Sequence, residues 1–212
     1  MIKAAIFDMD GLLIDSERII MQACIHAAQA VGIRYTQDEY AALIGRAGPD
    51  STRLMKAQLG GEDAFNQVMQ GLDAQLALRN HAFPLKTGAL KLLQHYQRSH
   101  VVCCVASSSS IHHISHRLQQ AGVSEYFSHF TSGQEVARGK PDPDIYLLAL
   151  EKLGLTAEAC VVFEDSEVGA RAAISAGLKV VVVPDLVQPS EYVREQAHYV
   201  LESLSHWLVM QH

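Results

Sequence analysis

Two aspartates with one residue between them follow the first apolar run of the chain. Asp8 and Asp10 come directly after residues 4–7, which are predicted to form a short buried strand, and Gly11 then lets the backbone turn. In an open α/β sheet, ligands gather just beyond the carboxyl ends of the strands. Two acids in this arrangement suit a divalent cation, because a carboxylate and a nearby backbone carbonyl can both bind it. Alternatively, one carboxylate is a nucleophile and the other a general acid/base.

An isolated pair of aspartates with this spacing is more often part of a solvated turn. Its interpretation therefore depends on the residues at the ends of the other apolar runs. The run of residues 101–106 ends in four serines, 107–110, at the start of a predicted helix. The hydroxyls of Ser107 and Ser108, with the backbone N–H groups of a helix N-terminus, predict an anion site. The alternative is a helix cap followed by a polar turn.

A lysine lies further along, in a stiff part of the chain. Lys140 stands between Gly139 and Pro141, just before a predicted helix, and Pro143 comes two residues later. The two prolines restrict the backbone around the lysine. Lys140 is therefore a better candidate for a fixed positive charge than an ordinary surface lysine.

A second acidic pair ends another apolar run. Glu164 and Asp165 follow residues 161–163, which are predicted to form a buried strand. An acidic pair that is buried without a cation would be repulsive and costly. We therefore expect Asp165, with Glu164 as a further candidate, to share a metal ion with Asp8 and Asp10.

Together these groups describe a site for phosphoryl transfer. A metal ion and a lysine offset the negative charge of the transferred group, while a hydroxyl and backbone donors hold one of its oxygens. Asp8 is then placed to attack the phosphorus in line. The sequence thus predicts that Asp8, Asp10, Ser107 and Lys140 are catalytic, and that Ser108 helps Asp8, Ser107 and Lys140 to bind the phosphate.

The order of the elements predicts how these residues are brought together. From about residue 89 onward, apolar strands without polar alternation are each followed by a helix, which indicates a parallel sheet covered on both faces. Residues 16–82 contain helical patterns and no strand-like run. We expect this all-helical segment to be an insertion placed directly after the first strand.

Composition and charge limit the class of protein. The chain of 212 residues is 49% hydrophobic and 19% charged, which is typical of a globular protein. Its net charge of -6 argues against nucleic acid or an anionic membrane as a partner. The four cysteines form no C-x-x-C pair and fit a reducing cytoplasm. No apolar stretch is long enough to span a membrane, so we expect a soluble cytoplasmic protein. No long apolar stripe is left over for a large interface, so we also expect a monomer.

The four motifs together resemble those of a known family. The sequence is similar to haloacid dehalogenase superfamily hydrolases, in the branch of small phosphatases and β-phosphoglucomutase with a helical cap. The motifs that match, in order, are Asp8-Met9-Asp10-Gly11, Ser107, Lys140 and Glu164-Asp165. Asp15, Asp144 and Gly177 also fit the pattern of this branch. The resemblance covers nearly the whole chain. It implies a Rossmann-like, doubly wound parallel core (1–15 and 83–212), a helical cap (16–82), a Mg²⁺ ion and an aspartyl-phosphate on Asp8. Asp10 would protonate the leaving alcohol and later activate water.

Within this branch, three departures separate the chain from the mutase. Ile20 stands where the mutase has a histidine in the first cap helix, and Ile44 stands where it has a basic residue before a glycine. The mutase has a Lys-Asn pair after the serine motif, and this chain has Ser110-Ile111 there. These changes remove the groups that would hold a second phosphate, so a hydrolase is favoured. Arg46 remains the best candidate in the cap loop for contact with the substrate, unless it is an exposed loop arginine.

The leading hypothesis is therefore a Mg²⁺-dependent phosphatase of a small phosphorylated metabolite, above all a sugar phosphate. A phosphosugar mutase is the first alternative. A receiver-like signalling domain is the second, because it also uses acids, a phosphorylated aspartate, a hydroxyl and a lysine. Such a domain needs neither an acid/base at Asp10 nor a helical insertion. A dehalogenase is the third, and the predicted metal-binding acids count against it.

Overall fold

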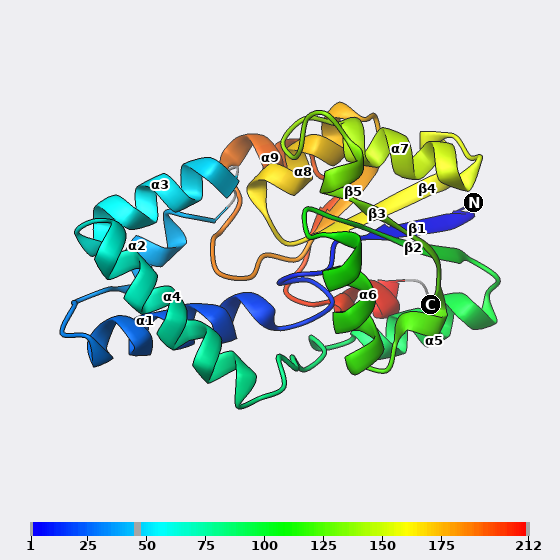
Figure 1. The fold of residues 1–212 in the computed structure, drawn as a ribbon. Helices are drawn as coiled ribbons and strands as arrows, with labels where there is room; N and C mark the ends of the chain where they lie inside the picture. Colours follow the sequence, from blue (N-terminus) through cyan, green and yellow to red (C-terminus); the bar gives the residue numbers. More distant parts are fainter. Residues whose placement is uncertain (1, 45–47, 211–212) are drawn as a thin grey trace.

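The central element of the protein is a six-stranded parallel sheet (Figure 1). The structure is a computed structural model that describes residues 2–44 and 48–210. The strand order is β3-β2-β1-β4-β5-β6. The strands are β1 (Ala4–Phe7), β2 (Val102–Ser107), β3 (Phe127–Ser132), β4 (Cys160–Glu164), β5 (Lys179–Val182) and β6 (Tyr199–Val200). The first strand of the sequence thus lies in the middle of the sheet, between β2 and β4.

Residues of β1 alternate between two apolar clusters, one on each face of the sheet. Ala5 and Phe7 pack into the first cluster, and Ala4 and Ile6 pack into the second. The ring of Phe7 stacks on that of Phe163 with centroids 4.9 Å apart, which fixes β1 against β4. Because both faces are covered, the strand has no polar alternation. Asp8, which follows Phe7, is therefore delivered to the carboxyl edge of the sheet.

Helices cover both faces of the sheet, as the alternating pattern predicts. The first cluster includes residues of α5 (Ala89–Arg98), α6 (Ile111–Gln120) and α10 (Leu204–Met210). The second includes residues of α7 (Asp144–Leu153), α8 (Glu167–Ser175) and α9 (Glu191–Gln196). Short 3-10 helices occur at Ser124–Tyr126, Gly133–Glu135 and Ala157–Ala159. The prediction of a doubly wound α/β sheet is confirmed.

The remaining helices form a group with an apolar cluster of its own. They are α1 (Ser16–Ala30), α2 (Gln37–Ala41), α3 (Gly48–Leu59) and α4 (Glu62–Ala77), and Figure 1 shows them to one side of the sheet. Their cluster includes Cys24, Ala28 and Tyr35 together with Leu59 and Val68. The division of the chain at 15/16 and 82/83 stays a prediction.

The two chain segments that lead into and out of this helical group are bonded to each other. Ile14 and Leu85 form an antiparallel bridge. The N–H of Asp15 donates to the carbonyl of Pro84 at 2.9 Å, and the N–H of Lys86 donates to the carbonyl of Leu13 at 2.9 Å. The helical group is therefore joined to the sheet through one paired strip of backbone. Among the described residues, no helix is long and apolar enough to cross a membrane.

Candidate active site

The carboxyl edge of the sheet brings together three of the predicted motifs. Phe7 pairs with Val105 of β2 and with Phe163 of β4, so Asp8 lies level with the ends of both neighbours. Glu164 is the last residue of β4 and Asp165 follows it. The motifs are far apart in sequence, and the register of the parallel strands alone places them side by side.

Lys140 reaches this edge from the segment before α7. Its Nζ donates to Asp8 Oδ1 at 2.7 Å, to Glu164 Oε1 at 2.5 Å and to the carbonyl of Ala106 at 3.1 Å. Only 4% of its side chain is exposed. Burial alone would lower the pKa of Lys140, but the carboxylates of Asp8 and Glu164 outweigh it and hold that pKa well above its usual value. Lys140 is the fixed positive charge that the sequence predicts.

Glu164 is fully buried and both of its oxygens have partners. In addition to Lys140, the hydroxyl of Tyr146 donates to Oε1 at 2.6 Å. The N–H of Asp165 donates to Oε2 at 3.1 Å, and Ser166 donates to the same oxygen through its N–H at 3.3 Å and its hydroxyl at 3.1 Å. These contacts leave fewer lone pairs for a metal ion. They favour Glu164 as the group that positions Lys140.

Three carboxylates lie close enough to share a cation. Asp8, Glu164 and Asp165 each offer an oxygen, and these atoms lie within 4.8 Å of one another. Burial, followed by the charge of Glu164, raises the pKa of Asp8 to about 7 against the opposing effect of Lys140. Burial, with the charges of Asp8 and Glu164, also raises the pKa of Asp165 well above its usual value. The cluster therefore carries more negative charge than one lysine offsets, and hard oxygen ligands of this kind fit a divalent cation such as Mg²⁺.

The side chain of Asp10 is held by a separate set of donors. Its Oδ1 accepts from the Ser16 hydroxyl at 2.6 Å and from Arg117 Nη1 at 2.5 Å, and its Oδ2 accepts from the Ser109 hydroxyl at 3.0 Å. Its carboxylate is not one of the three clustered acids. Sequence reasoning missed all three donors. Ser109 lay within the serine run, but a single arginine on a helix, such as Arg117, gives no indication of its partner.

The serine motif lies at the end of β2, beside β1. Ser107 is 2% exposed, and its hydroxyl oxygen accepts from the N–H of Ser109 at 3.2 Å. Ser108 is exposed at the start of the turn after β2. The expected capping role belongs to Ser110, whose hydroxyl oxygen accepts from the N–H of His113. Arg46, the predicted substrate contact, lies outside the described residues.

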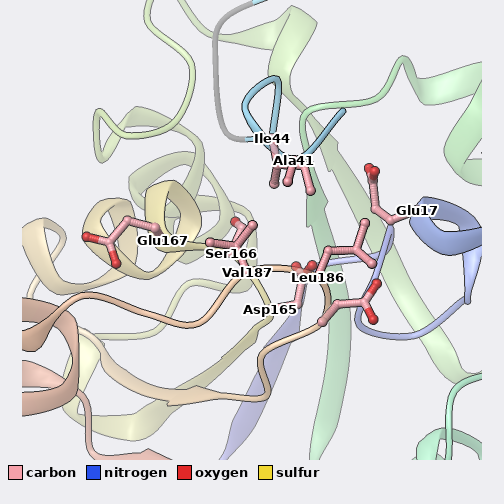
Figure 2. Close-up of a pocket in the computed structure, with 9 residues that line it drawn as sticks. Glu17, Ala41, Ile44, Asp165, Ser166, Glu167, Leu186 and Val187 are labelled. Carbon is pink, nitrogen blue, oxygen red and sulfur yellow. The ribbon is translucent and has the colours of Figure 1, made fainter. Parts of the chain in front are cut away.

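A cleft opens next to the acidic cluster. It is lined by residues from the helical group, from the end of β4 and from the loop after β5: Glu17, Ala41, Ile44, Asp165, Ser166, Glu167, Asp185, Leu186 and Val187 (Figure 2). Asp165 belongs to both the cleft and the cluster, so a molecule in the cleft would adjoin Asp8. Of these residues, the sequence analysis singles out Ile44 and Asp165, and it gives no indication of Glu17 or Asp185.

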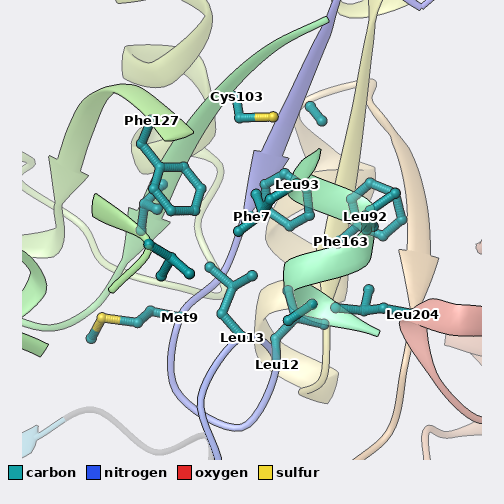
Figure 3. Packing of buried hydrophobic residues seen from close by; sticks show 14 of the residues in the cluster. Phe7, Met9, Leu12, Leu13, Leu92, Leu93, Cys103, Phe127, Phe163 and Leu204 are labelled. Atoms are coloured by element: carbon teal, nitrogen blue, oxygen red, sulfur yellow. The ribbon is translucent and has the colours of Figure 1, made fainter. Parts of the chain in front are cut away.

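The packing behind the site is dense and apolar. Phe7, Met9, Leu12 and Leu13 surround the turn that carries Asp8, and all four are fully or almost fully buried (Figure 3). Close packing of this kind leaves few alternative positions for the backbone. The nucleophile candidate is therefore held by a rigid strand end.

Comparisons with known proteins are consistent with this arrangement. A family profile described as haloacid dehalogenase-like hydrolase matches residues 2–177. A phosphorylated carbohydrates phosphatase of Thermotoga maritima is 30% identical over 84% of this chain and 82% of its own. Hexitol phosphatase A of Escherichia coli is 29% identical over 85% and 82%. The crystal structure of CbbY from Rhodobacter sphaeroides in complex with phosphate is 28% identical, with a TM-score of 0.76 over 97% of this chain and 96% of that one.

Proposed function

The chain belongs to the haloacid dehalogenase-like hydrolase family and is a phosphoric monoester hydrolase, and we propose that its substrate is a small sugar phosphate whose phosphoryl group passes to Asp8. The observation that carries the proposal is the contact between Lys140 Nζ and Asp8 Oδ1 at 2.7 Å. A cation so close favours the ionised form of this carboxylate against the effect of burial, and it leaves Oδ2 as the attacking atom. It also offsets charge on the arriving phosphate.

In the first step, an oxygen of Asp8 attacks the phosphorus in line with the bond to the leaving alcohol. The P–O bond to the alcohol breaks, and an acyl phosphate forms on Asp8. Asp10 gives its proton to the leaving oxygen, because an alkoxide is otherwise a poor leaving group. The serines at the end of β2, Ser107 and Ser108, bind the oxygens of the phosphoryl group.

In the second step, water attacks the phosphorus of the acyl phosphate. Asp10, now ionised, takes a proton from this water, phosphate leaves, and the carboxylate of Asp8 is restored. Asp10 is suited to this cycle because it has its own donors and is not among the three clustered acids. Arg117 and Ser109 fix its orientation between turnovers.

We propose that Asp8 and Asp165 hold a Mg²⁺ ion together with the backbone carbonyl of residue 10. The charge imbalance of the cluster supports this assignment, since burial and neighbouring carboxylates raise the pKa of both acids. The ion would supply positive charge beside the transferred phosphoryl group. Glu164 orients Lys140 through its 2.5 Å contact.

A hydrolase is favoured over a mutase by two residues of the chain between β1 and α5, Ile44 and Ile20. Ile44 forms part of its wall. Ile20 is partly buried against the apolar clusters. Neither offers a charge to hold a second phosphate. The four cysteines are free and buried, which supports a further proposal that the protein works in the reducing cytoplasm. That it is a monomer stays a prediction from the sequence.

The proposal is tested by measuring phosphate release from a panel of sugar phosphates. The wild-type protein is compared in Mg²⁺ and after chelation with EDTA, and Asp8→Asn is assayed beside it. We expect release that depends on Mg²⁺ and is abolished in a folded Asp8→Asn protein. Full activity without metal would exclude the metal assignment, and normal turnover by Asp8→Asn would exclude the covalent mechanism.

A further inference from the structure

The walls of the cleft are acidic. Four of the described lining residues are carboxylic acids, namely Glu17, Asp165, Glu167 and Asp185. No lysine, arginine or histidine is among the described residues that line the cleft. Asp165 belongs to the cluster beside Asp8. The other three acids line the same cleft beside this cluster, and the proposed function would put the alcohol part of a substrate in that cleft. A cleft that binds a substrate with a second anionic group would be expected to carry positive charge.

Two of these three acids have their charge offset by cations and by hydrogen bonds. Asp185 Oδ1 accepts from Lys86 Nζ at 2.7 Å and from Arg18 Nε at 2.8 Å. Glu167 accepts from Arg171 Nε at 2.6 Å and from the hydroxyl of Ser190 at 2.7 Å. Neither of them is an uncompensated charge. Their part in the cleft is to shape its walls.

Glu17 is different, because no cation pairs with it among the described residues. Its one hydrogen bond there comes from the Tyr40 hydroxyl to Oε2 at 3.3 Å, which leaves Oε1 without a donor. It is half-buried at the start of α1, and burial, with the charge of Asp10, raises its pKa to about 7. Figure 2 shows it on the wall opposite Glu167. A carboxylate that is partly desolvated and short of donors binds a hydroxyl well and repels an anion.

We propose that Glu17 selects substrates by the charge of their leaving group: it accepts a hydrogen bond from a hydroxyl of an uncharged sugar or polyol, and it repels a carboxylate or second phosphate in the same place. The inference rests on the proposed function, because it concerns the alcohol that the hydrolysis releases. Ala41 and Leu186 supply apolar surface on the same walls, which suits the carbon chain of such an alcohol.

The test compares two substrates that differ only in this charge. Sorbitol 6-phosphate carries a CH₂OH group where 6-phosphogluconate carries a carboxylate, and p-nitrophenyl phosphate has neither in its leaving group. The variant is Glu17→Gln, which keeps the size of the side chain, and the matched control is Glu167→Gln on the same cleft. Assays at about pH 8 keep the Glu17 carboxyl mostly ionised.

We expect the wild-type protein to prefer sorbitol 6-phosphate, and Glu17→Gln to reduce the ratio of the two kcat/KM values by about tenfold. The rate with p-nitrophenyl phosphate should change by less than about threefold, because that leaving group makes neither contact. An unchanged ratio in Glu17→Gln, or an equal change in Glu167→Gln, would overturn the inference. If the wild-type protein hydrolyses only the aryl phosphate, the inference fails and the hydrolase remains. If it hydrolyses none of the three, the proposed function fails as well.

Discussion

Replacing Lys140 by methionine should cost far more stability than the same change at Lys152. Both lysines donate to a carboxylate and to a backbone carbonyl: Lys140 to Glu164 and Ala106, Lys152 to Glu135 at 2.8 Å and Phe130 at 3.0 Å. The two sites differ in burial. The Lys140 side chain is 4% exposed and its partner Glu164 is not exposed at all, whereas the values for Lys152 and Glu135 are 27% and 38%.

The magnitude depends on this difference in burial. Removing one partner of a buried ion pair leaves a desolvated charge and costs about 3–5 kcal/mol. Lys140→Met leaves two such carboxylates, Asp8 and Glu164, so we expect a loss at the upper end of that range. An exposed pair contributes about 0–1 kcal/mol, so Lys152→Met should reduce the free energy of unfolding by about 1 kcal/mol at most.

The pH dependence gives a second criterion. Without Lys140, burial holds the folded-state pKa of Asp8 still further above its unfolded value. The destabilisation is then absent below the unfolded pKa, at about pH 4, and grows as the pH rises and the Asp8 carboxyl ionises. Urea unfolding in EDTA at about pH 8 and about pH 5 measures both effects. Equal losses for the two lysine variants at about pH 8, or a Lys140→Met loss that does not shrink at about pH 5, would refute this reasoning.

Three further predictions concern the same region. Asp10→Asn should slow acyl-phosphate formation from an alkyl phosphate by about 10²- to 10⁴-fold in rapid-quench experiments, and by much less from an aryl phosphate; wild-type rates with both would exclude Asp10 as the acid. Gly169→Ala should destabilise the protein by about 1–3 kcal/mol in urea unfolding, because the new methyl group would overlap the Glu164 carboxylate; wild-type stability would contradict that packing. Glu17→Gln should increase the free energy of unfolding by up to about 3 kcal/mol above pH 7 and leave it unchanged below pH 4.5. The reason is that the pKa of Glu17 is raised from 4.5 to about 7 in the folded protein, so its ionisation costs stability. An effect that does not depend on pH would contradict this reasoning.

Much of the sheet could be predicted because buried parallel strands are continuous apolar runs. Residues 101–106 and 161–163 are predicted in this way, and the structure has strands at Val102–Ser107 and Cys160–Glu164. The two-residue strand Tyr199–Val200 gives only a weak signal in the sequence, since a short edge strand with exposed and half-buried residues has little apolar pattern. Helix ends are also marked in the sequence where a glycine follows the helix, as Gly32 follows α1 and Gly177 follows α8.

The site could be predicted where its motifs follow strands and, at Lys140, where two prolines stiffen the chain. Asp8 and Asp165 end neighbouring strands, so the topology alone brings them together. The contact of Arg117 with Asp10 depends on where a helix turns its face, which a lone arginine does not indicate. Glu164 was predicted as a metal-ligand candidate, and the donors that occupy its oxygens became visible only in three dimensions. Its role at the metal stays a prediction.

The paired backbone at Ile14 and Leu85 has a consequence for how such a protein can diversify. The two ends of the intervening segment are already held side by side, so the free-energy cost of closing a loop between them depends only weakly on its length, by about 0.6 kcal/mol for each doubling. A longer, shorter or differently folded segment is therefore tolerated at this point without disturbing β1. New substrate preferences can arise by exchange of one contiguous stretch of chain, while the strand that carries Asp8 is inherited unchanged.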